Sequence, residues 1–287
     1  MFYYNIRDFE IPVSTLIFGC WQLSKKGWRS VQLHEARETL HLAVEKGVTV
    51  FDTAPIYGYG LSETILGEEL SSIRSKINIF SKCGLFWKEG KVSHDNSPDS
   101  IERQINESLK RLKTDYIDGI VIHWPDNKVP VEITLKCLNK LRDQKIIRSI
   151  GLSNFSVEIL KRVIQDFEID IVQYKYNYLE REVEKEILQM VKDNNIRFWA
   201  YSPLAQGLLT DNIDENYNFQ KSDIRKLNPL FEKENLIKAV EIRNSMGENP
   251  IKKSLGFLVK NEKVDSIIIG MSKKTHLTEN LDYFKLV

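Results

Sequence analysis

Short apolar runs alternate with longer amphipathic segments along the whole chain, and this alternation constrains the fold more than any other feature. Most of the apolar runs are unbroken and rich in Ile, Val and Phe, as expected of strands buried on both faces of a parallel sheet. The segments between them, such as residues 97–112, place apolar side chains on one helical face. The eight runs cover residues 16–19, 48–51, 77–80, 117–122, 149–152, 169–172, 197–200 and 266–269.

Eight strands that alternate with helices in 287 residues predict an α/β fold of the (β/α)8 TIM-barrel type, whose usual size is about 250 residues. We expect one barrel domain over residues 1–287, with an N-terminal β-hairpin before residue 16 closing its bottom. A doubly wound open sheet is the alternative. When such a sheet binds dinucleotides it normally carries GxGxxG after the first strand, and residues 18–27 (FGCWQLSKKG) lack that pattern.

The composition argues against several classes of function. A formal net charge of +1 gives no electrostatic case for a nucleic acid or an anionic membrane as a partner. No run approaches the ~20 apolar residues of a membrane helix, and Arg7, Asp8 and Glu10 interrupt the apolar core that a signal peptide would need. The three cysteines form no CxxC, which argues against a disulfide framework or a metal site. We therefore expect a cytoplasmic protein.

Polar residues follow several of the apolar runs, and barrel enzymes build their sites at the carboxyl ends of strands. Asp52, Lys82 and His123 end the second, third and fourth runs. Because these strands are neighbours in a barrel, the three side chains should converge on one pocket with Tyr57. A single such residue is more often a cap or an ion-pair partner, but three neighbouring strand ends make coincidence a poorer explanation.

The four side chains together suit proton transfer to a carbonyl oxygen. Tyrosine, with an ordinary pKa of about 10, is a poor acid at neutral pH. A nearby lysine ammonium should lower the pKa of Tyr57, and Asp52 should hold that ammonium in place. His123 can orient the carbonyl oxygen in the same pocket. Such a site also needs a hydride donor.

Seven motifs contain or follow these residues along nearly the whole chain: FDTAPIYGYGLSETILGEEL (51–70), FSKCG (80–84), HWPD (123–126), GLSNFS (151–156), VQYKYNYLER (172–181), AYSPLAQGLL (200–209) and IIIGMSKKTHLTEN (267–280). In this order and spacing they resemble the motifs of the aldo-keto reductases, in the bacterial type with a short C-terminus. The resemblance implies a (β/α)8 barrel, a nicotinamide cofactor bound without a Rossmann motif, and hydride transfer to an aldehyde or ketone, with sugars among the candidates. It assigns the catalytic roles to Asp52, Tyr57, Lys82 and His123, with Tyr57 as the general acid.

The resemblance also implies a set of cofactor contacts. The family commonly has Arg or Lys two residues after the glycine of the last motif, whereas this chain has Ser272 followed by Lys273. No acidic residue occurs between Gly270 and Thr278, so we expect NADP(H), with NAD(H) as the alternative. The implied contacts are Trp21, Asp52, Ser153, Asn154, Gln173, Tyr201, Ser202, Leu204, Gly207, Gly270, Ser272, Lys273, His276 and Asn280.

The substrate is expected to be a small carbonyl compound, bound in an aromatic pocket that no long C-terminal tail covers. An accessory role is the alternative function, because some relatives of this fold bind the cofactor as regulatory subunits of ion channels. We expect a monomer or a small homo-oligomer. The predicted substrate contacts are Trp21, Tyr57, Phe86, Trp87, His123 and Trp124.

Overall fold

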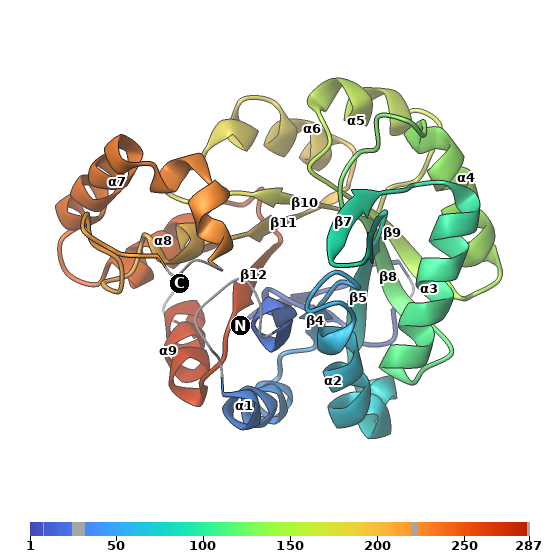
Figure 1. Ribbon diagram of the computed structural model, residues 1–287, viewed down its shortest axis with the longest axis horizontal. Helices are drawn as coiled ribbons and strands as arrows, with labels where there is room; N and C mark the ends of the chain where they lie inside the picture. The colour runs from blue at the N-terminus through green and yellow to red at the C-terminus, as the bar shows by residue number, and fades with distance from the viewer. Residues whose placement is uncertain (8, 25–31, 220–222, 286–287) are drawn as a thin grey trace.

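A closed barrel of eight parallel strands forms the centre of the molecule in the computed structural model, which describes residues 1–7, 9–24, 32–219 and 223–285 (Figure 1). The eight strands predicted from the apolar runs are confirmed, with ends that shift by a few residues. In order around the barrel the strands are β3 (Leu16–Gly19), β4 (Val50–Asp52), β5 (Asn78–Cys83), β8 (Ile117–Ile122), β9 (Ile147–Ser153), β10 (Ile171–Lys175), β11 (Arg197–Tyr201) and β12 (Ser266–Gly270).

Helices between the strands surround the barrel (Figure 1). In α3, for example, Pro98 occupies the first turn, and Ile101, Ile105 and Leu112 are buried against the barrel. None of the helices in the described part of the chain is long and apolar enough to cross a membrane. The helices are α1 (Leu33–Glu45), α2 (Leu61–Leu70), α3 (Pro98–Leu112), α4 (Val131–Asp143), α5 (Val157–Val163), α6 (Ile187–Asp193), α7 (Lys233–Ser245), α8 (Pro250–Val259) and α9 (Lys274–Lys285).

An antiparallel hairpin precedes the barrel, as predicted. Its strands are β1 (Tyr3–Tyr4) and β2 (Val13–Ser14), and Asp8 in its connection lies outside the described residues. Ile6, Phe9 and Val13 are buried in one cluster with the first residues of the barrel strands β4 and β10. The hairpin therefore closes the end of the barrel where the strands begin, and leaves the opposite end for a site.

Two long connections extend beyond the carboxyl ends of the strands. After β5 the chain forms a second hairpin, β6 (Leu85–Lys88) and β7 (Lys91–His94). After β11 it passes through three short 3₁₀ helices, η4 (Ala205–Gly207), η5 (Ile224–Leu227) and η6 (Pro229–Phe231), before α7. This second excursion has a small apolar core of its own, in which Leu208, Ile213 and Val240 are buried.

Candidate active site

A buried ion pair lies at the carboxyl end of the barrel. Asp52 is the last residue of β4 and Lys82 lies on the neighbouring β5, and each is at most 4% exposed. Lys82 Nζ donates to Asp52 Oδ1 at 2.6 Å and to the Thr53 main-chain oxygen at 2.9 Å. Gln173 Nε2 on β10 donates to the other carboxylate oxygen at 2.7 Å. Every bond lies within normal hydrogen-bond range, so the pair is compensated despite its burial.

Tyr57 and His123 lie beside this pair, so the four side chains predicted to converge do lie together. The Lys82 ammonium is 5.2 Å from the centroid of the Tyr57 ring. The rings of Tyr57 and His123 meet edge to face with centroids 6.0 Å apart. Trp21 covers Tyr57 with a centroid distance of 4.9 Å. Tyr57 itself is 9% exposed, which leaves its phenol almost closed off from bulk water.

The predicted direction of the Tyr57 pKa shift is wrong. Burial raises the pKa of Tyr57 well above 10, and the negative charge of Asp52 and the neighbouring thiol of Cys20 raise it further. These effects outweigh the Lys82 ammonium, which lies 5.2 Å from the centroid of the Tyr57 ring and is bonded to Asp52. The consequence is that the phenol retains its proton throughout the neutral range.

The pKa of His123 is lowered, so the ring is not a protonated imidazolium that could act as an acid. Desolvation of the ring lowers its pKa well below 6.5, and the charges of Lys82 and His94 lower it further. His94, at the end of β7, was not predicted as a neighbour of the site. Its hairpin turns at Glu89 and Gly90, which both have the positive φ of a two-residue turn, and the glycine is the sequence signal that could have marked it. At neutral pH His123 is therefore a neutral imidazole, which can donate a hydrogen bond.

Several predicted cofactor residues form a connected network next to His123. Asn154 Nδ2 donates to the His123 main-chain oxygen at 3.0 Å and to Ser153 Oγ at 2.9 Å. The Tyr201 hydroxyl donates to Asn154 Oδ1 at 2.6 Å. Asn154 and Ser202 have φ values of 66° and 54°, and residues held in such conformations concentrate at functional sites. Gln173 is directed to Asp52, and so orients the ion pair.

A cleft of about 470 Å³ lies between the excursion after β11 and the start of α9. Five predicted cofactor residues line it: Gly207, Gly270, Ser272, Lys273 and His276. Leu204 packs instead between two apolar cores, and Asn280 is buried on α9. The cleft also contains Gln22, Glu35 and Arg225, which were not predicted because they are distant in sequence from the motifs. Arg225 is paired with Asp223, at 2.6 Å.

The predicted substrate residues follow the carboxyl ends of the neighbouring strands β3, β4, β5 and β8. Trp124 directly follows His123 and is 43% exposed. Phe86 and Trp87 are half-buried on β6 of the second hairpin. The Trp87 ring packs against Tyr59, with centroids 5.5 Å apart. Of these predicted residues, Trp21 and His123 have ring contacts with Tyr57.

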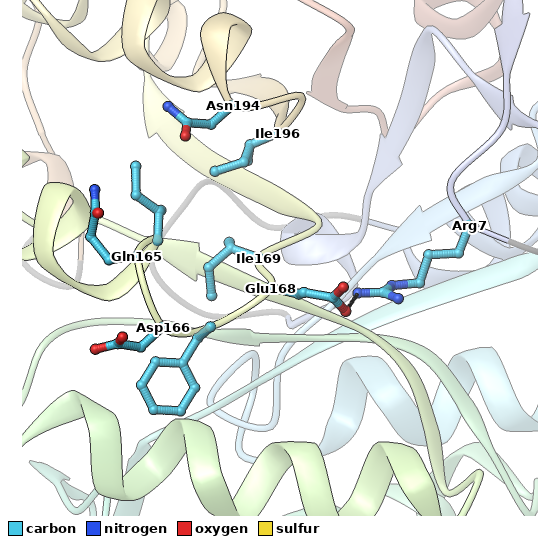
Figure 2. A pocket seen from close by; sticks show the side chains of 9 residues that line it. Arg7, Gln165, Asp166, Glu168, Ile169, Asn194 and Ile196 are labelled. Carbon is cyan, nitrogen blue, oxygen red and sulfur yellow. Dashed lines mark hydrogen bonds and ion pairs between the residues drawn. The ribbon is translucent and has the colours of Figure 1, made fainter.

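Another hollow, of about 400 Å³, lies at the opposite end of the barrel (Figure 2). It is bordered by Arg7 of the first hairpin and by residues that precede β10 and β11, among them Ile169 and Asn194. Arg7 Nη2 is bonded to Glu168 at 2.9 Å, and Arg7 also pairs with Asp170. The charge of Arg7 is balanced by these carboxylates. The residues that line the hollow include no tyrosine, lysine or histidine like those grouped around Tyr57.

Comparisons with known proteins agree with this architecture. The family model "Aldo/keto reductase family" matches residues 15–287. The aldo-keto reductase YhdN of Bacillus subtilis is 37% identical over 81% of this chain and 71% of its own length. The NADH-specific methylglyoxal reductase of Escherichia coli is 30% identical over 95% of this chain and 90% of its own.

Solved structures give the same result. The glycerol dehydrogenase of Gluconobacter oxydans superposes with a TM-score of 0.86 at 29% identity, over 98% of this chain and 90% of its own. The barrel, the order of the motifs and these similarities agree, and the chain belongs to the aldo/keto reductase family.

Proposed function

We propose that this protein is an NAD(P)H-dependent reductase of aldehydes or ketones, with Tyr57 as the general acid. The observation that carries the proposal is the grouping of Tyr57, His123 and the Lys82–Asp52 pair at the open end of the barrel. A reduced nicotinamide, when bound, supplies a hydride to the carbonyl carbon. The remaining requirements, a proton for the carbonyl oxygen and a fixed orientation, fall to the side chains of this chain.

Tyr57 donates that proton. The phenol is protonated before reaction, so its proton is available at neutral and moderately alkaline pH. The neutral His123 imidazole donates an N–H to the same oxygen and so orients it. Lys82, held by Asp52, places a positive charge against the ring and offsets the negative charge that develops on the phenol oxygen.

The described residues fit a nicotinamide dinucleotide. Ser153 and Asn154 offer polar groups next to His123 for a carboxamide, and Tyr201 offers a ring fixed through its hydroxyl. The cleft beyond them contains Lys273 and a buried acceptor, Gln22 Oε1, that has no donor among the described residues. Lys273 and Ser272 support NADP(H), because a 2'-phosphate needs a cation and hydrogen-bond donors. The name of the E. coli relative supports NAD(H) as the alternative.

The substrate is proposed to be a small aldehyde or ketone, with sugars included. Trp21, against Tyr57, and the exposed Trp124 provide apolar faces on which a carbon skeleton can pack. The names of two similar proteins, a methylglyoxal reductase and a glycerol dehydrogenase, support a short polar molecule of this class.

Tyr57→Phe tests the proposal. Turnover of NADPH with a nitrobenzaldehyde should fall by about 10²–10⁴, the usual contribution of a positioned general acid. NADPH affinity, measured by fluorescence titration, should stay unchanged. Tyr178→Phe, on an exposed ring that packs against Phe257 of α8, is the matched control and should retain full turnover. Wild-type turnover in Tyr57→Phe would exclude Tyr57 as the donor. Cofactor binding by the wild type without turnover of any aldehyde, ketose or quinone would favour the accessory role.

A further inference from the structure

The cleft that contains Lys273 also contains a carboxylate. Glu35, in the first turn of α1, lines it together with Ser272 and His276, and is half-buried. The packing of α1 against α9 brings these residues together (Figure 1). Glu35 has no side-chain hydrogen bond or ion pair among the residues that the structure describes. Glu38, one turn further along α1, differs in this respect, because its carboxylate is paired with Lys274 Nζ at 2.9 Å.

A second acceptor in the cleft also has no donor. Gln22 Oε1 is buried without a hydrogen-bond partner in the described residues. Its amide packs directly against Gly270, where an added Cβ would lie 2.2 Å from Gln22 Nε2. The absence of a side chain at position 270 therefore allows the amide to lie in the cleft wall. The wall of the cleft therefore contains two acceptors without a donor in the described residues, and one of them, the Glu35 carboxylate, is charged.

This pattern discriminates between the two nicotinamide dinucleotides. The free 2'-hydroxyl of NAD(H) can donate a hydrogen bond to a carboxylate or an amide oxygen. The 2'-phosphate of NADP(H) offers mainly acceptors and carries nearly two negative charges at neutral pH, so it repels a carboxylate. Lys273 and His276 attract the same phosphate. The cleft thus contains groups that favour each cofactor.

We propose that Glu35 is a cofactor-specificity residue, which accepts a hydrogen bond from the ribose 2'-hydroxyl of NAD(H) and disfavours the 2'-phosphate of NADP(H). This inference rests on the proposed function, because it requires that the cleft hold the adenosine end of the cofactor. No local pattern near Gly270 marks this carboxylate, because Glu35 is distant from that segment in the sequence. The fold supplies the carboxylate from the opposite end of the chain.

Glu35→Gln tests this directly, with dissociation constants for NADPH and NADH measured by fluorescence titration at low ionic strength. The affinity for NADPH should rise about tenfold, the magnitude expected of one charged contact. The affinity for NADH should stay the same or fall by a few-fold, because the neutral amide is a weaker acceptor. Glu35→Lys should raise the ratio of NADPH to NADH affinity further. Lys273→Ala should lower this ratio of affinities. Added salt should reduce the difference between each of the three variants and the wild type.

Glu45→Gln is the matched control, since it removes the same charge from an exposed position in the last turn of α1. Its affinity ratio should equal that of the wild type. The inference is overturned if both cofactors bind but the ratio in Glu35→Gln and Glu35→Lys stays within twofold of the wild-type ratio. Failure of the wild type to bind either cofactor is a different result, which overturns the proposed function as well.

Discussion

The lowered pKa of His123 makes the stability of the fold depend on pH. Its pKa lies well below 6.5 in the folded protein, whereas the unfolded chain has the ordinary value of about 6.5. Between these two values the unfolded state binds the proton and the folded state does not. Stability therefore falls as the pH drops below about 6.5, by up to about 1.4 kcal/mol per pH unit for one such group.

Replacing His123 with Gln removes this contribution. The difference in the free energy of unfolding between pH 7.5 and pH 5.5, from urea titrations, should be smaller in His123→Gln than in the wild type. His34→Gln, at an exposed position on α1, is the control and should keep the wild-type difference. An identical pH dependence in all three proteins would mean that the His123 ring is not held neutral by the fold.

Residues at strand ends were predictable, whereas contacts between distant segments were not. Asp52, Lys82 and His123 each follow an apolar run, so strand order alone brings them together. The pKa of Tyr57 depends instead on burial and on the nearby charge of Asp52, which only the packed site reveals. Glu35 enters the cleft through helix packing, and no local pattern marks it.

At the scale of secondary-structure elements, the barrel strands were predictable and the two excursions were not. Strands buried on both faces carry a strong signal, because most of their residues are apolar. The described parts of the connection between β11 and α7 consist of short turns with a small separate core. Their sequence therefore shows neither the alternation of a strand nor the periodicity of an amphipathic helix. The position of this connection depends on specific buried contacts.

Arg243 makes buried hydrogen bonds to the connection that follows β11. It lies on α7, is 8% exposed, and its Nη1 donates to the main-chain oxygens of Thr210, at 2.6 Å, and Ile213. Both acceptors belong to residues that line the cleft that contains Lys273. Arg243→Leu should leave these oxygens without a donor, at about 1–3 kcal/mol for each unsatisfied group.

The expected results for Arg243→Leu are faster hydrogen exchange across residues 205–219 and several-fold weaker NADPH binding. The barrel strands should keep their protection, because the excursion has its own core. Arg162→Leu serves as the control, since Arg162 is 61% exposed at its side chain and pairs only at the surface with Glu132. Unchanged exchange in 205–219 after Arg243→Leu would show that other contacts hold the excursion.

For the molecule as a whole, the barrel separates stability from chemistry. The hairpin and the first residues of the strands form one apolar cluster at one end, and the polar site occupies the other. Barrels that place loops with functional residues at the carboxyl ends of strands can vary them without disturbing the closed end. Substitutions at the closed end should therefore lower the stability and leave turnover nearly unchanged. Substitutions at the polar site should lower turnover and leave the stability nearly unchanged.

Phe9→Ala and Tyr57→Phe form the comparison. Phe9 is 6% exposed and its ring centroid lies 6.1 Å from that of Phe80 inside the barrel. Truncation of a buried Phe costs about 3–5 kcal/mol, a large part of the roughly 5–15 kcal/mol that separates folded from unfolded domains. Phe9→Ala should thus unfold at a clearly lower urea concentration yet keep near wild-type turnover while it remains folded. Tyr57→Phe should keep near wild-type stability and lose turnover.

Phe2 offers a control of the same residue type in the same hairpin. It is 62% exposed, so Phe2→Ala should change stability by no more than about 0.5 kcal/mol. Equal losses of stability in Phe2→Ala and Phe9→Ala would mean that the hairpin contributes through its backbone pairing and not by filling the barrel. Loss of turnover in folded Phe9→Ala would contradict the separation itself, because the closed end would then control the geometry around Tyr57.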